Sequence, residues 1–227
     1  MPRYRRPVME GIPLHIIQRG NDRRPCFFSD SDYLVYLDML RESIALANCK
    51  LHAYVLMSNH VHLLMTPGHI TSAAELMKRV GERYVQYVNR RYKRYGTLWQ
   101  GRFKSCLVQD DGYLLICHRY IELNPVRACM VTRPSEYRWS SHQHNAHGVH
   151  NPLLQAHSLY TSLAQDQRER EAIYRKMFAD ELSTDDLREV REAVNSNTIF
   201  GSERFAESME SAWGNNILPR RPGRVRD

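Results

Sequence analysis

The sequence predicts an α+β fold: a ferredoxin-like split βαβ arrangement, an antiparallel sheet with helices on one face, followed by a helical C-terminal extension. The first observation is the order of local patterns, which runs β-α-β-β-α-β over roughly the first half of the chain. The second is a change beyond Pro134, where strand-like alternation gives way to charged helical patterns. A chain of 227 residues can bury a core of this size.

The first four elements are set by alternation and turn residues. A β-prone run at His15–Gly20 precedes N-cap candidates at 29–32 and helical apolar spacing over Tyr33–Ala47. Two further strands, Leu51–Met57 and His60–Thr66, flank a tight turn at Ser58-Asn59.

The remaining elements of the sheet domain follow the same reasoning. A long amphipathic helix is expected from about Thr71-Ser72 to Tyr95, ended by Gly96. A strand is expected over Gly101–Gln109, and a helix from about Gly112 to Leu123, where Asn124-Pro125 should stop it.

The domain organisation follows from these patterns. Residues 1–140 would form the sheet domain, 141–215 a helical extension with two or three charged helices, and 216–227 a basic tail. The tract at 141–158 is rich in His, Asn and Gly and suggests a loop, so its His142-Gln143-His144 is interpreted as solvated surface.

Positive charge is clustered along the chain. The net charge is +7, and basic residues gather at the start, over 78–104, and in the tail, which includes Arg220, Arg221 and Arg224. A single cluster could be a solvated helix face. Three clusters together favour a polyanionic partner, most often nucleic acid.

Composition excludes several classes of protein. The content of 42% hydrophobic and 25% charged residues is typical of a soluble globular protein, and no apolar run is long enough to span a membrane. The basic start lacks the apolar segment of a secretory signal. Five cysteines without a C-x-x-C pair indicate reduced thiols, so we expect a cytoplasmic, nucleoid-associated protein.

The segment NHVHLL carries the first chemical signal. On a strand, His60 and His62 point to the same side, which supplies two ligands of a divalent-metal site. Taken alone, the pair is weak evidence of a metal site and is more typical of a half-buried strand that contains two histidines.

The segment RYIELNPVRA could complete that site. Tyr120 and Asn124 are four residues apart and share a helix face, and an amide at a helix end can turn toward a partner. The spacing of Tyr113, Cys117 and Tyr120 is also that of a core stripe, and Asn-Pro is also a plain helix stop. The residue pattern leaves these alternatives open.

Together, NHVHLL, LWQGRFKS and YIELNPVRA resemble the single-tyrosine HUH transposases, and more narrowly the REP-associated tyrosine transposases of bacteria. The resemblance covers about residues 4–141. It implies the fold of the HUH endonucleases, with His60 and His62 as metal ligands, Asn124 as the third ligand and Tyr120 as the nucleophile.

The resemblance also implies the reaction and the partner. A protein of this kind uses Mg²⁺ or Mn²⁺ to cut single-stranded DNA beside a repetitive hairpin, forming a 5′-phosphotyrosine intermediate. We expect DNA contacts from Trp99, as a stacking platform, and from four cations. These are Arg23, Arg24, Arg102 and Lys104. Solvated cations and a core tryptophan are the alternative for these residues.

Two other functions share many of these features. A non-catalytic protein that binds REP-like hairpins would keep the basic clusters and not need Tyr120. A phosphodiesterase that uses water would need carboxylate ligands, which do not flank the histidine pair. No residue is identified as a general base, since His118 and Glu122 should lie on the far side of the helix from Tyr120. A monomer is favoured slightly over a dimer.

Overall fold

The computed structural model describes residues 6–213, so the predicted tail and its Arg220, Arg221 and Arg224 lie outside the described residues. One five-stranded sheet organises the chain, in the order β2-β3-β1-β4-β5. Its strands are β1 (Leu14–Arg19), β2 (Cys49–Met57), β3 (His60–Pro67), β4 (Lys104–Val108) and β5 (Ile199–Phe200). The first four pair antiparallel in the order expected of a ferredoxin-like fold, and β5 adds to β4 in parallel.

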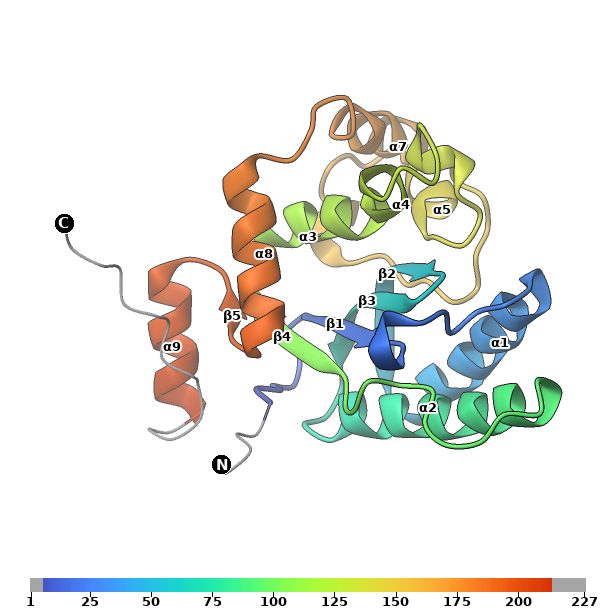
Figure 1. Ribbon diagram of the computed structural model, residues 1–227. Coiled ribbons are helices and arrows are strands. Elements are labelled where there is room, and N and C mark those ends of the chain that lie inside the picture. The colour runs from blue at the N-terminus through green and yellow to red at the C-terminus, as the bar shows by residue number, and fades with distance from the viewer. Residues whose placement is uncertain (1–5, 214–227) are drawn as a thin grey trace.

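The two helices that connect these strands cover one face of the sheet (Figure 1). They are α1 (Asp30–Leu46) and α2 (Ser72–Arg91). Helix α1 begins with a capping box between Ser29 and Asp32. The buried Asp32 carboxylate also accepts hydrogen bonds from the hydroxyls of Tyr87 and Tyr92, which fastens α1 to α2.

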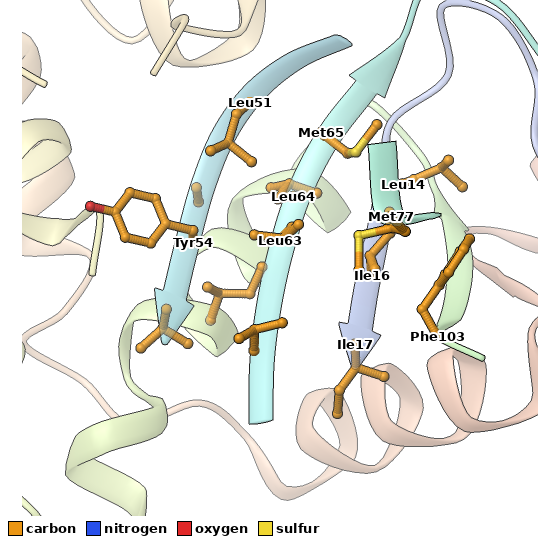
Figure 2. Close-up of a cluster of buried hydrophobic side chains, with 14 of the residues drawn as sticks. Leu14, Ile16, Ile17, Leu51, Tyr54, Leu63, Leu64, Met65, Met77 and Phe103 are labelled. Atoms are coloured by element: carbon orange, nitrogen blue, oxygen red, sulfur yellow. The ribbon is translucent and has the colours of Figure 1, made fainter. Parts of the chain in front are cut away.

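The core between this face and the helices is mostly apolar. Leu14, Ile16, Leu63 and Met65 alternate along β1 and β3, have no exposed surface, and lie beneath Met77 of α2 (Figure 2). Burying such side chains stabilises the fold by about 1.5–3 kcal/mol each. The alternation that predicted the strands is therefore the alternation between two covered faces.

The opposite face carries α3 (Gly112–Glu122), with α4, α5 and α7 farther out on the same side (Figure 1). The shorter elements are the 3-10 helices at Asn21–Arg23 and Pro134–Glu136, α4 (Asn124–Arg127), α5 (His142–His147) and α6 (Ser158–Thr161). The later helices are α7 (Gln167–Lys176), α8 (Thr184–Ser196) and α9 (Glu203–Trp213). The described part of the chain contains no helix that is long and apolar enough to span a membrane.

The predicted fold class and the order of the first six elements are confirmed. Three details were wrong. Helix α2 ends at Arg91 rather than near Tyr95, because Lys93 adopts a left-handed φ of 50°. The tract around His142 is partly helical, and His142 is buried. Strand β5 was not expected, because a two-residue strand is too short to show alternation.

Candidate functional site

Three histidines lie together on the face of the sheet that α3 covers. Directly paired residues point to the same side, and the register pairs Ile17 with His62 and Arg19 with His60. His15, two residues before Ile17, therefore shares that side with both histidines of NHVHLL. The rings of His60 and His62 lie 5.0 Å apart, as do those of His15 and His62.

The side chain of Asn59 fixes which nitrogen of His60 is free. The Asn59 Nδ2 donates to the backbone oxygen of Arg23 at 3.0 Å, which turns Oδ1 toward His60. His60 Nδ1 lies 2.6 Å from that oxygen and so must carry the proton. The lone pair of His60 Nε2 is left for another partner, and the side chain of Asn124 lies near this imidazole, where it raises the pKa of His60.

A second hydrogen bond fixes His62. Its Nδ1 lies 2.8 Å from Nε2 of His15, and both side chains are buried. When His62 Nδ1 donates this bond, its Nε2 keeps a lone pair that can bind a metal. His15 Nδ1 is buried and finds no hydrogen-bond partner among the described residues.

Burial keeps these imidazoles neutral. It lowers the pKa of His60 to about 4, with a contribution from the charge of Arg19 and an opposing one from the Asn124 hydrogen bond. Burial also lowers the pKa of His62 well below its usual value, and that of His15 to about 3. Neutral imidazole is the form that ligates metals.

Helix α3 brings Tyr120 to the histidines. The Tyr120 ring is 6% exposed and lies 5.8 Å from the ring of His62 and 5.7 Å from that of His15. Burial is what the core-stripe interpretation predicted, and the histidine neighbours favour the interpretation of Tyr120 as a nucleophile.

Asn124 opens α4 directly after the end of α3. The expected helix stop is therefore only a break, since Pro125 needs no backbone N–H in the first turn of the new helix. Asn124 Nδ2 is buried and unpaired within the part of the chain that the structure describes. A buried polar atom without a partner is uncommon in proteins and is consistent with a ligand that occupies this point in the functional complex.

Arg127 holds a positive charge against Tyr120. Its guanidinium lies 4.4 Å from the centre of the Tyr120 ring, and Nη2 donates to the Tyr120 backbone oxygen at 2.6 Å. Burial and the charge of Arg191 lower the pKa of Arg127 to about 10, against the opposing effect of Tyr120. Nη1 is buried and unpaired among residues 6–213, so it can donate to an anion.

A basic pocket of about 270 Å³ adjoins His60. It is lined by Ile17, Arg19, Arg23, Gln100, Arg102, Lys104 and Asn195. Three of the four predicted phosphate-binding cations thus meet in one pocket, joined by Arg19. Lys104 donates to Asn195 of α8 at 3.2 Å, so the C-terminal region forms part of its wall.

The other predicted DNA contacts lie elsewhere. Arg24 is exposed and pairs with Asp22 at 3.4 Å. Trp99 is 5% exposed and packs near Tyr36 and Tyr84, so its ring faces are within the core. This is the core position that was the alternative for Trp99.

The far side of α3 holds a buried polar network. The Glu122 carboxylate accepts hydrogen bonds from Ser141, Asn145, His142 and Tyr174, at distances of 2.5–3.0 Å. His118 Nδ1 lies 3.2 Å from the Tyr174 hydroxyl. As the helix periodicity indicated, both His118 and Glu122 face away from Tyr120, and His142 belongs to this network rather than to the solvated surface.

Sequence reasoning missed His15, Arg19 and Arg127. A signal for His15 was present, because a histidine inside a buried apolar strand needs a polar partner. For the two arginines there was none, since their roles depend on strand pairing and on the turn between α3 and α4.

The donor set fits a divalent metal. Within the described residues, no three His, Cys, Asp or Glu side chains form a group that could hold a metal ion. A site here would consist of Nε2 of His60 and of His62 with the amide oxygen of Asn124. The two hydrogen bonds that free both Nε2 atoms support this set.

Comparisons with known proteins give a family and a fold. The family described as "Transposase IS200 like" matches residues 8–124. A structure of a REP-associated tyrosine transposase bound to a REP hairpin is 19% identical, with a TM-score of 0.53 over 70% of this chain and 93% of the other. A structure from Deinococcus radiodurans R1 assigned as a transposase is 21% identical, with a TM-score of 0.36 over 48% and 88%. No curated protein matches.

Proposed function

Because the chain belongs to the IS200-like transposase family, we propose that this DNA-processing enzyme is a metal-dependent single-stranded DNA endonuclease and strand transferase. Its substrate would be hairpin-forming, REP-like repetitive DNA. One observation carries the proposal: within a single chain, the Tyr120 ring packs against His62 while the side chain of Asn124 lies near His60.

Tyr120 is the proposed nucleophile. Its oxygen forms a bond to the scissile phosphorus while the bond to the 3′ oxygen breaks, giving a 5′-phosphotyrosine and a 3′ oxygen that takes up a proton to become a free 3′-OH. A second DNA 3′-OH then displaces Tyr120 and rejoins the strands. A phenolate, with a pKa of about 10, leaves more readily than an alkoxide, so the intermediate stays reactive.

The Nε2 atoms of His60 and His62 and the Asn124 amide oxygen would hold Mg²⁺ or Mn²⁺. Such an ion, when bound, would polarise the scissile phosphate and offset charge in the transition state. All three ligands are neutral, so the set does not reduce the charge of the ion. Nitrogen ligands favour Mn²⁺ over Mg²⁺.

Arginines supply the remaining positive charge. Arg127 lies over the Tyr120 ring and stabilises the negative charge that develops on the tyrosine oxygen during attack. Arg19, Arg23, Arg102 and Lys104 bind phosphates next to the site. The hairpin with a short single-stranded guide is proposed because the fold is that of the REP-associated transposase solved with a REP hairpin. Because Tyr120 reaches the histidines of its own chain, a monomer suffices, acting on chromosomal DNA in the cytoplasm.

An adduct assay tests the proposal. The protein is incubated with labelled hairpin oligonucleotides from the repeats that flank its gene, with Mn²⁺, with Mg²⁺ or with EDTA. We expect a covalent protein–DNA band on a denaturing gel that requires metal and is absent with Tyr120→Phe, while hairpin affinity is unchanged. Binding without an adduct in any condition would instead favour the non-catalytic hairpin-binding protein.

A further inference from the structure

A second pocket lies on the opposite face of the sheet from the histidines. It has a volume of about 710 Å³, within the range of ligand-binding pockets, and lies between α2 and the segment 97–103 that precedes β4. Met77, Val85 and Phe103 give it apolar walls, and Gln18 of β1 and Trp99 reach it from the core.

Two buried polar groups in this pocket lack partners. Gln18 is 7% exposed and Trp99 5%, yet Gln18 Oε1 and Trp99 Nε1 make no hydrogen bond within the described region. Burial without a partner costs free energy, and an apolar side chain would avoid that cost. A bound group that offers both an acceptor and a donor would satisfy the pair.

Gly81 of α2 packs next to both side chains. A Cβ at this position would lie 3.7 Å from Trp99 Nε1 and 3.8 Å from Gln18 Nε2, which is ordinary contact distance. Glycine in a helix interior is destabilising relative to alanine, so its presence here has no local benefit. A larger side chain at 81 would fill the space in front of the two polar groups.

The rim of the pocket is positively charged. Arg6 lies 4.1 Å from the centre of the Phe103 ring and donates to the Phe103 backbone oxygen, and Arg102 and Lys78 line the same pocket with one acid, Glu82. Arg102 also lines the basic pocket beside His60. An anionic chain could therefore pass from one pocket to the other over Arg102.

We propose that this pocket binds one unpaired nucleobase of the single-stranded DNA substrate. Trp99 Nε1 donates to an acceptor on the base edge, and the Gln18 amide pairs with a neighbouring group of the same edge, as glutamine does with base edges in general. Phe103, Met77 and Val85 cover the apolar faces, and Arg102 binds the backbone between this base and the catalytic site. The inference rests on DNA being the substrate, and it does not require Tyr120 to be reactive.

An abasic scan tests the pocket. Hairpin oligonucleotides with a single abasic site at each unpaired position are titrated by fluorescence anisotropy against proteins that carry Tyr120→Phe, which prevents cleavage. Three versions are compared: Gly81, Gly81→Leu, which fills the pocket, and Gly81→Ala, which fits it. Because one buried base contributes a factor of about ten or more in affinity, we expect one abasic position to weaken binding tenfold. Gly81→Leu should weaken the affinity for the intact oligonucleotide by the same factor, and the abasic site should then cause no further loss in this variant. Gly81→Ala should have the same affinities as the protein with Gly81.

The proposal is overturned if no single position matters, or if the abasic loss is equally large in Gly81→Leu. Gln18→Leu is the second variant if Gly81→Leu does not fold. In Gln18→Leu, too, the abasic site should cause no further loss of affinity. The adduct assay with unmodified Tyr120 separates the two proposals. If adducts form but the abasic loss does not depend on residue 81, the proposed enzyme activity stands and the proposed base pocket is wrong. If the abasic loss depends on residue 81 but no adducts form, the base pocket stands and the enzyme activity is wrong.

Discussion

The two sides of helix α3 contrast in how their polar atoms are satisfied. On the side of Glu122, a buried carboxylate accepts four hydrogen bonds and joins α3 to α5 and α7. On the side of Tyr120, His15 Nδ1, Asn124 Nδ2 and Arg127 Nη1 are buried without partners among residues 6–213. The Glu122 side has an exception, because His118 Nε2 is buried there without a partner among the described residues.

This difference separates support from function. The network around Glu122 holds the helix, because hydrogen bonds within the protein compensate the buried carboxylate. Unpaired N–H donors next to a tyrosine are available to a phosphate. Changes on the Glu122 side should therefore alter stability, and changes on the Tyr120 side should alter chemistry.

The largest effect on stability should come from Glu122→Ala. It removes a buried charge and leaves four hydrogen-bonding groups without their acceptor, so we expect the free energy of unfolding to fall by about 3–5 kcal/mol. Urea denaturation measures this. Glu136→Ala, which removes an exposed carboxylate paired with Arg133, is the matched control and should have a much smaller effect. Equal losses would contradict the structural role of Glu122.

Arg127→Met should slow adduct formation about 100-fold, because the cation over Tyr120 no longer stabilises the attacking oxygen. Methionine keeps much of the side-chain volume, so urea denaturation should show only a minor loss of stability. The rate is measured by quenching single-turnover reactions. An unchanged rate would show that Arg127 only packs on Tyr120.

His15→Phe should weaken Mn²⁺ binding 10- to 100-fold, because His62 loses the hydrogen bond that frees its Nε2. Calorimetric titration of the DNA-free protein measures the affinity directly. His52→Phe replaces a buried histidine that bonds Gln155 and Thr66 instead, and should leave Mn²⁺ affinity unaltered. Equal Mn²⁺ affinities for His15→Phe and wild type would show that His15 does not support the metal site.

A smaller effect is the pH dependence of stability. Burial lowers the pKa of His52 to about 3 and that of His118 to about 4, from 6.5 in the unfolded chain. The unfolded state therefore binds more protons below pH 6.5, so stability is complete above that pH and falls as pH decreases. Each histidine contributes a slope of about 1.4 kcal/mol per pH unit. Urea denaturation from pH 7 to 5 should be less steep for His52→Phe than for wild type, and equal slopes would exclude His52 as a source.

The fold was largely accessible from the sequence, because alternation along β1 and β3 and the periodicity of α1 and α2 reflect direct burial against one core. The metal ligands and Tyr120 came from a family resemblance rather than from spacing, which left Tyr120 equally suited to a core stripe. The contact of His15 with His62 could not be predicted, since it depends on the register of β1 with β3. The hydrogen-bond network of Glu122 was also missed, because its partners lie about 20–50 residues away in sequence and meet only in the folded chain.

The most direct test is the identity of the residue that becomes attached to DNA. The adduct formed on the hairpin oligonucleotide with Mn²⁺ is digested with nuclease and protease, and the nucleotide-bearing peptide is sequenced by mass spectrometry. We predict a 5′-phosphodiester on Tyr120, one of 13 tyrosines in the chain. Attachment at any other residue would contradict the assignment of the catalytic site.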